Sequence, residues 1–135
     1  MNSILVDSNV LLDIFTRDAT WMAWSEAALA EAADRSQLVI NPMIFGEVSV
    51  RFSRIEDLDD VLPASLFARE AIPFEAAFLA GKAFQAYRNR GGAKRSPLPD
   101  FFIGAHASVS GHRLLTRDAR RYRTYFPRLE IISPG

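Results

Sequence analysis

Four acidic residues in this sequence stand beside or within apolar segments. Asp7 and Asp118 each follow a short apolar run. Asp100 follows a proline-rich loop, and Glu47 lies within the largely apolar stretch NPMIFGEVSVRF. Carboxylates that come together repel one another unless a cation neutralises them, and ligands that are all oxygens favour hard ions such as Mg²⁺ or Mn²⁺. One or two such ions can activate a water for phosphodiester hydrolysis, which is the chemistry that these acids indicate.

Each carboxylate also has a purely structural explanation. Aspartate is a common N-cap, which can account for Asp100 and Asp118, and a lone glutamate on a helix commonly faces solvent. Asp7 is harder to explain in this way, because Ser8 and Asn9 beside it are already good N-cap residues. The charge at Asp7 is therefore surplus to local structure, which favours a functional role.

Strands alternate with helices along the chain. Short apolar runs predict strands at residues 3–6, 37–40, 113–116 and 129–132. Helical spacing and end signals predict helices at residues 9–15, 21–35, 41–52, 55–62, 74–90, 100–110 and 118–126. Residues 63–72 are ambiguous and can hold another helical turn and a short strand.

This alternation indicates an α/β fold with a mainly parallel central sheet of four or five strands, flanked by helices on both faces. Ligands of such sheets bind outside the carboxyl ends of the strands. Asp7 and Asp118 follow two of the predicted strands, so we expect them at this edge, where Asp100 can also face. Glu47 must either face solvent or point into a cleft.

Length and composition bound the class of protein. The chain has 135 residues, of which 49% are hydrophobic and 24% charged, and we expect one globular domain over residues 1–135. Zero cysteines exclude disulfides and zinc–thiolate sites, and two histidines make a histidine-rich metal site improbable. The sequence has neither a signal-type segment nor an apolar stretch that could span a membrane, so we expect a cytoplasmic protein.

The net charge of zero conceals a division along the chain. Residues 1–81 carry 13 acids and 5 bases, whereas residues 82–135 carry 3 acids and 11 bases. A basic segment of this kind suits a nucleic-acid surface, but two halves of one domain can also simply neutralise each other. The charge pattern alone leaves both interpretations open.

Four short motifs, in order, resemble a known family. VDSNVLLD is similar to the opening DTNVLLD motif of PIN-domain ribonucleases, specifically VapC toxins of type II toxin–antitoxin pairs, and FGEVSVRF to their helix-borne glutamate. PDFFIGAHA resembles their D-x-x-I-A-A-x-A helix, and LLTRDARRYRTYFP their T-R-D-x-x-x-F segment. Order and spacing agree over essentially the whole chain, so the set is far more specific than any one motif.

The resemblance implies a three-layer PIN-like fold and a role for each matching residue. Asp7, Glu47, Asp100 and Asp118 match the acidic residues that hold Mg²⁺ or Mn²⁺ for endoribonucleolytic cleavage. Asn9 and Thr116 match the polar residues beside them. The sequence departs mildly at Ser8, where threonine is usual, and at Gly104, where alanine is usual. The expected products carry 5′-phosphate and 3′-hydroxyl ends. Asp13 also falls in the opening motif, but we expect it on the surface of the helix.

The resemblance also implies partners. A VapB-like antitoxin is expected to neutralise the toxin, with an apolar antitoxin helix in a groove near the N-terminal helices, and the toxin is expected to form a homodimer. Trp21, Met22 and Trp24 offer more apolar surface than one buried face usually hides, although core packing can also explain them. Lys94, Arg95 and Arg117 are the bases that we expect to contact RNA phosphates.

Two other classes of protein remain as alternatives. A haloacid-dehalogenase-like phosphatase also places an aspartate after its first strand, but it needs a second aspartate at the position of Asn9. A non-catalytic PIN module that only binds RNA or protein would retain the fold, but it would have no need for four acids.

Overall fold

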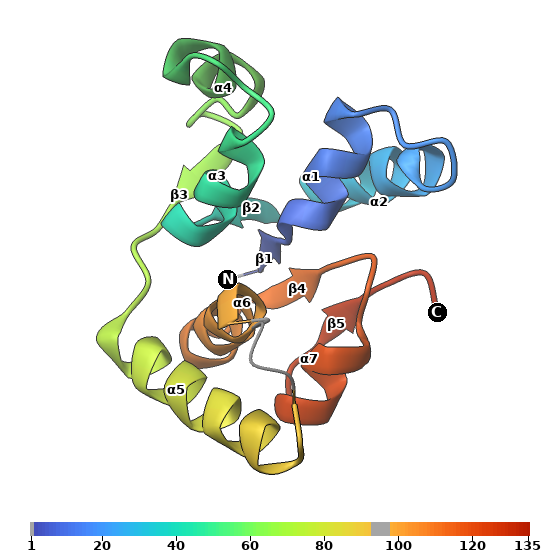
Figure 1. The fold of residues 1–135 in the computed structure, drawn as a ribbon. Coiled ribbons are helices and arrows are strands. Elements are labelled where there is room, and N and C mark those ends of the chain that lie inside the picture. Colours follow the sequence, from blue (N-terminus) through green and yellow to red (C-terminus); the bar gives the residue numbers. More distant parts are fainter. Residues whose placement is uncertain (1, 93–97) are drawn as a thin grey trace.

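A computed structural model describes residues 2–92 and 98–135, which form a parallel sheet between two layers of helices (Figure 1). The strand order is β3-β2-β1-β4-β5, and all neighbouring strands are parallel. The strands are β1 (Ser3–Val6), β2 (Gln37–Ile40), β3 (Phe67–Arg69), β4 (Arg113–Leu115) and β5 (Ile131–Ile132). The predicted parallel α/β fold is therefore confirmed, with five strands in the described residues.

The helices cover both faces of this sheet. They are α1 (Ser8–Phe15), α2 (Met22–Arg35), α3 (Pro42–Ser49), α4 (Ile55–Val61), α5 (Phe74–Asn89), α6 (Leu98–Ser110) and α7 (Arg120–Tyr125). In Figure 1, α1 and α2 lie on one face, and α5 and α6 lie on the other. Apolar side chains of β1, β2 and β4 fill the space between these layers and are almost fully buried.

The backbone explains the bounds of three stretches that the sequence predicted only approximately. The helix predicted at 41–52 is α3, which ends at Ser49 because the backbone N–H groups of Arg51 and Phe52 bond three residues back in a tighter turn. The ambiguous stretch 63–72 contains β3 after a turn closed on the carbonyl of Pro63. Gly91, with φ of 87°, closes α5 as its left-handed residue.

The predicted starts of the last two helices also differ from the structure. Asp100 lies in the first turn of α6, which begins at Leu98, so it does not mark the helix start. The last helix begins at Arg120, and the residue at its N-cap position is Ala119. Asp118 therefore precedes the helix in a turn, and the N-cap explanation fails for it. Among the described residues, no helix is long and apolar enough to cross a membrane.

Candidate functional site

Asp7 stands between β1 and α1 at the carboxyl edge of the sheet. Its backbone N–H donates to the carbonyl of Leu115 on β4 at 2.9 Å, so the strand pairing itself fixes the position of the residue. Asp7 occupies the N-cap position of α1, yet its side chain makes no capping hydrogen bond. The side chain is only 3% exposed. The structure thus agrees with the prediction that this charge does not serve the helix start.

Hydroxyl groups hold one oxygen of the Asp7 carboxylate. Thr116 Oγ1 and Tyr122 Oη each donate to Asp7 Oδ2 at 2.9 Å, and Asn9 Nδ2 approaches the same oxygen at 3.4 Å. Asn9 Nδ2 also donates to Thr116 Oγ1 at 3.1 Å. The predicted neighbours Asn9 and Thr116 therefore both lie beside Asp7.

The three other acids surround this carboxylate. Ser8 Oγ donates to Glu47 Oε1 at 2.8 Å and lies 3.4 Å from Asp7 Oδ1, so Glu47 on α3 points toward the cluster while remaining half-buried. Tyr122 Oη lies 3.4 Å from Asp100 Oδ1. The backbone N–H of Asp118 donates to Thr116 Oγ1 at 3.2 Å, which places exposed Asp118 at the rim.

The electrostatics of the site show how closely these acids interact. Burial, and next the charge of Asp100, raise the pKa of Asp7 from 3.8 to about 7. Burial is also the main cause that raises the pKa of Glu47 and of Asp100. Burial first, and then the Asp7 and Asp100 charges, raise the Tyr122 pKa well above its usual value, so its hydroxyl remains a donor. A divalent cation would relieve this repulsion.

The donor set fits a hard cation. Asp7, Glu47, Asp100 and Asp118 offer only carboxylate oxygens, which are the ligands that Mg²⁺ and Mn²⁺ prefer. In residues 2–92 and 98–135, however, no three of these acids bring one oxygen each within 4.8 Å of one another. Mg²⁺ usually keeps several of its waters, so water can complete contacts that the carboxylates do not reach directly.

One group of three side chains does satisfy that distance in the described residues, but it lies apart from the four acids. Glu70, His106 and His112 bring one ligand atom each within 4.8 Å of one another. His106 Nε2 and His112 Nε2 lie 3.0 and 2.8 Å from Glu70 Oε1. The two buried histidines were not predicted as a pair, because five residues and a helix end separate them in the sequence.

Hydrogen bonding shows that this second group is poorly suited to a metal. Asn41 Oδ1 accepts from the backbone N–H of Ile44 at 2.9 Å, so Asn41 Nδ2 is the atom that faces His106 Nδ1 at 3.0 Å. An amide nitrogen can only donate, which makes His106 Nδ1 an acceptor and places the ring proton on Nε2. That nitrogen then donates to Glu70 and has no lone pair for a metal ion.

The position of Asp13 differs from the one expected from the sequence. It was expected on the helix surface, but it is 2% exposed. Arg117 Nε and Nη2 donate to its two oxygens at 2.9 and 3.0 Å, and Ser25 Oγ donates to it at 2.8 Å. The expectation was wrong because the side-chain partners of Asp13 in the described residues, Ser25 and Arg117, lie 12 and 104 positions away in the sequence. The Arg117 guanidinium, which also lies 5.5 Å above the Trp21 ring, is thus already engaged, and its contact with RNA stays a prediction.

The other predicted RNA contacts can be placed only in part. Lys94 and Arg95 lie outside the described residues. Arg121 Nη1 pairs with Asp100 Oδ2 at 2.8 Å, and a pocket at the rim of the acid cluster is lined by Asp118, Arg120, Arg121, Thr124 and Tyr125. Basic side chains therefore do border the acids on the α7 side.

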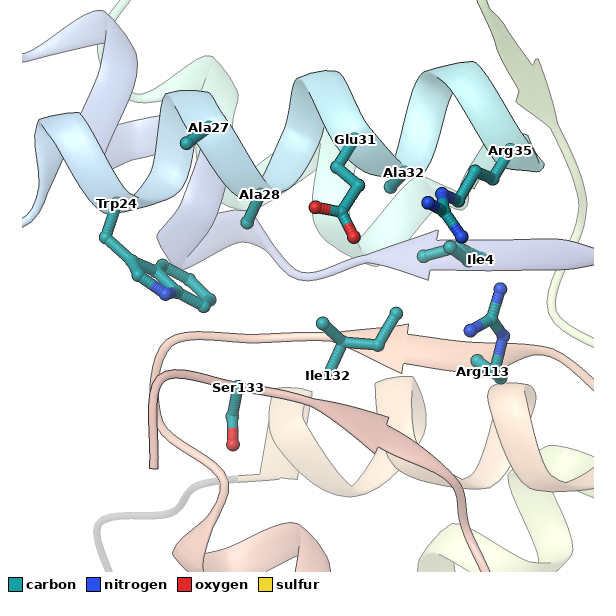
Figure 2. A pocket seen from close by; sticks show the side chains of 10 residues that line it. All are labelled: Ile4, Trp24, Ala27, Ala28, Glu31, Ala32, Arg35, Arg113, Ile132 and Ser133. Atoms are coloured by element: carbon teal, nitrogen blue, oxygen red, sulfur yellow. The ribbon is translucent and has the colours of Figure 1, made fainter.

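An apolar groove lies beside α2, away from the acid cluster. Figure 2 shows Trp24 at one end of the groove and Arg35 and Arg113 at the other, with Ile132 of β5 opposite α2. Small residues of α2 form its wall, and the full lining is Ile4, Trp24, Ala27, Ala28, Glu31, Ala32, Arg35, Arg113, Ile132 and Ser133. Trp24, singled out in the sequence for its apolar surface, is thus only partly covered by the core.

Tyr122 is the member of the site that the sequence analysis missed. Its hydroxyl contacts both Asp7 and Asp100, and no role at the site was predicted for it from the sequence. A signal was present, because Tyr122 stands where the family segment T-R-D-x-x-x-F has phenylalanine. Tyrosine at this position adds a hydroxyl group close to the charges of Asp7, Asp100 and Glu47.

A sequence profile described as the PIN domain matches residues 4–127. The comparison with curated protein sequences gives no match.

Solved structures share the fold over nearly their full length. VapBC2 from Rickettsia felis, bound to a DNA fragment from its promoter, superposes with a TM-score of 0.72 at 14% identity and covers 98% of this chain and 99% of that chain. A toxin–antitoxin complex from Klebsiella pneumoniae has a TM-score of 0.71 at 22% identity, covering 98% of both chains. FitAcB from Neisseria gonorrhoeae has a TM-score of 0.65 at 16% identity, covering 97% of both chains. Identities this low show the fold alone, but the profile spans most of the sequence, and the chain therefore belongs to the PIN domain family.

Proposed function

We propose that this protein is a Mg²⁺- or Mn²⁺-dependent endoribonuclease of the VapC type. The observation that carries the proposal is the state of Asp7. Its carboxylate is buried at the end of the central strand, its pKa is raised to about 7, and its charge is coupled to those of Asp100 and Glu47. A buried cluster of acids with so little positive charge is typical of a site for a divalent cation.

Each residue has a defined part in this proposal. Asp7, Glu47, Asp100 and Asp118 hold the cation, and Thr116 and Asn9 orient Asp7. When bound, the cation stabilises negative charge on the phosphodiester and makes water a better nucleophile, which allows hydrolysis to 5′-phosphate and 3′-hydroxyl ends. The phosphatase alternative has no support at Asn9, whose amide donates a hydrogen bond to Thr116 but cannot act as the acid or base that a second aspartate would supply.

The surroundings of the acids suit an RNA substrate. We expect the protein to meet this RNA in the cytoplasm. Arg120 and Arg121 lie at the rim, and with Lys94, Arg95 and Arg117 they supply positive charge along the path of a polyanion. Such contacts bind phosphates without reading sequence. They account for affinity, whereas cleavage preference must come from elsewhere in the complex.

The proposal includes a protein partner and a second copy of the chain. The solved structures that share this fold include a toxin–antitoxin complex and VapBC2 bound to promoter DNA. The groove beside α2 offers an apolar floor for a helix of a VapB-like antitoxin. Phe74 and Phe78 lie one turn apart on α5 with exposed fractions of 93% and 70%, which supports a homodimer through an apolar surface.

The test is RNA cleavage by purified protein with Mg²⁺, Mn²⁺ or EDTA. Cleavage should require the metal, and Asp7→Asn should abolish it while the circular dichroism spectrum stays unchanged. Asp34→Asn, which changes an exposed acid on α2, is the matched control and should cleave normally. Wild-type cleavage by Asp7→Asn, or full activity in EDTA, would rule out the four-acid site.

A further inference from the structure

The two oxygens of the Asp7 carboxylate have different surroundings. Thr116 Oγ1 accepts from Asn9 Nδ2 at 3.1 Å and from the backbone N–H of Asp118 at 3.2 Å, so its single proton goes to Asp7 Oδ2 at 2.9 Å. Ser8 has one hydroxyl proton as well, and Glu47 at 2.8 Å takes it in preference to Asp7 Oδ1 at 3.4 Å. Oδ2 thus accepts a short hydrogen bond from Thr116, whereas Oδ1 has no committed donor among the described residues.

Tyr122 supplies the second strong hydrogen bond to Oδ2. Its one hydroxyl proton goes to Asp7 at 2.9 Å, because Asp100 Oδ1 lies farther away at 3.4 Å. The hydroxyl therefore reaches a metal-binding carboxylate directly and has a second one close by. Its donation favours the charged form of Asp7 in a buried place where other forces oppose that charge.

The fold holds the Tyr122 ring firmly in this position. The side chain is 2% exposed and lies between α6 and α7. A Cβ atom at Gly104 of α6 would come within 3.0 Å of Tyr122 Cδ1 and within 2.5 Å of Phe126 Cε2. Gly104, where the family usually has alanine, thus lets these rings pack directly on the α6 backbone. A ring fixed in this way can hold its hydroxyl in one place.

We propose that Tyr122 is a positioning residue for the metal centre, because its hydroxyl and that of Thr116 hold Asp7 by Oδ2 and leave Oδ1 for the cation. This role rests on the proposed function, since it requires that Asp7 bind a divalent ion. Tyr122 itself touches neither the ion nor the RNA. It acts through Asp7 by fixing the orientation of the carboxylate before the cation arrives.

The test is direct Mn²⁺ binding, measured by the electron paramagnetic resonance signal of free Mn²⁺ in the absence of RNA. Tyr122→Phe should raise the dissociation constant roughly tenfold, as is typical when a partner of a metal ligand is lost. Tyr125→Phe is the matched control. It removes a hydroxyl from the same helix, and in the described part of the chain that hydroxyl bonds to nothing, so Mn²⁺ affinity should stay unchanged. Saturating Mn²⁺ should restore most of the cleavage by Tyr122→Phe.

The outcomes separate this role from simple packing. If Tyr122→Phe binds Mn²⁺ as tightly as the wild type, the positioning role is wrong, even if the variant melts at a lower temperature. If the wild type itself binds no Mn²⁺, the proposed function and this inference both fail. Wild-type binding that is lost in Asp7→Asn but unchanged in Tyr122→Phe would overturn this inference alone.

A second measurement does not depend on the stability of the variant. The sequence contains three tyrosines, so 3-fluorotyrosine labelling should give three ¹⁹F resonances. Tyr87→Phe and Tyr125→Phe assign two of them and identify Tyr122 by elimination. Saturating Mg²⁺ should shift the Tyr122 resonance. An unmoved Tyr122 resonance would show that its hydroxyl does not contact a metal-binding carboxylate.

Discussion

Asp7 binds its proton more tightly in the folded protein than in the unfolded chain. Burial raises its pKa from 3.8 to about 7, so between these pH values the folded state holds more of this proton than the unfolded state does. The contribution of Asp7 to stability is therefore full below about pH 4, is lost as the pH rises toward 7, and then stays level. Without a cation, the charge at Asp7 destabilises the protein at neutral pH.

This difference predicts that Asp7→Asn stabilises the metal-free protein. The gain should be at most about 4 kcal/mol at pH 8, from about 1.4 kcal/mol per unit of pKa shift, and it should shrink at pH 5 where Asp7 is already protonated. Thermal unfolding in EDTA at both pH values measures it, with Asp34→Asn as the control. An equal difference at pH 5 and pH 8 would mean that the Asp7 charge does not cause it.

At the scale of elements, a buried ion pair joins the start of the chain to its end. Asp13 on α1 accepts two hydrogen bonds from Arg117, which follows β4 and directly precedes Asp118. Ser25 on α2 donates to the same carboxylate. This pair therefore fixes the connection between β4 and α7, and Asp118 is part of that connection.

Asp13→Asn should destabilise the protein and lower its activity. We expect a loss of about 2 kcal/mol, less than for a fully buried pair because the Arg117 side chain is 30% exposed. Urea unfolding measures the loss. Asp59→Asn removes a partner from the exposed pair of Asp59 and Arg69, and it should cost less than about 1 kcal/mol. If both variants lost the same stability, the Asp13 pair would be no more than a surface contact.

The elements also show what the sequence can and cannot reveal. The strands at residues 3–6 and 37–40 have the predicted bounds, because short apolar runs with clear breaks are local signals. The pairing of Asp13 with Arg117 spans 104 positions, and that of Asp7 with Tyr122 spans 115. Nothing local to either residue identifies its partner. Asp7 and Asp118 were predicted at one edge because strand ends of a parallel sheet share it, and the resemblance to the family added Glu47 and Asp100. Tyr122 required the ring to be placed in three dimensions.

At the scale of the whole molecule, the order of the strands explains where the acids meet. The chain builds β2 and β3 on one side of β1 and then returns to place β4 and β5 on the other side. Asp7 follows β1 at this reversal, where open parallel sheets usually bind ligands. The more acidic half of the sequence contributes Asp7 and Glu47, and the basic half contributes the other two acids together with the surrounding arginines.

The basic half should make RNA binding sensitive to salt. Binding by inactive Asp7→Asn should weaken as salt rises, with a log–log slope of about −0.7 for each phosphate contacted on a single strand. Replacing Lys94 and Arg95 together by alanine should make the slope shallower by roughly one unit and weaken binding to all sequences alike. Arg35 and Arg54, at the end of α2 and the start of α4, provide the control pair. If the salt slope of Asp7→Asn stayed the same after Lys94 and Arg95 were replaced, the RNA would have to follow another path.

The span between Asp7 and its partners has a consequence for the protein during its synthesis. Thr116 and Tyr122, which hold Asp7, lie 109 and 115 positions after it, so the ribosome makes them long after Asp7. A nascent chain without β4 and α7 lacks Asp118, both hydroxyls and the strand that fixes the Asp7 backbone. The carboxylates therefore come together only after β4 and α7 have been made, and partial chains that leave the ribosome before then cannot assemble the site.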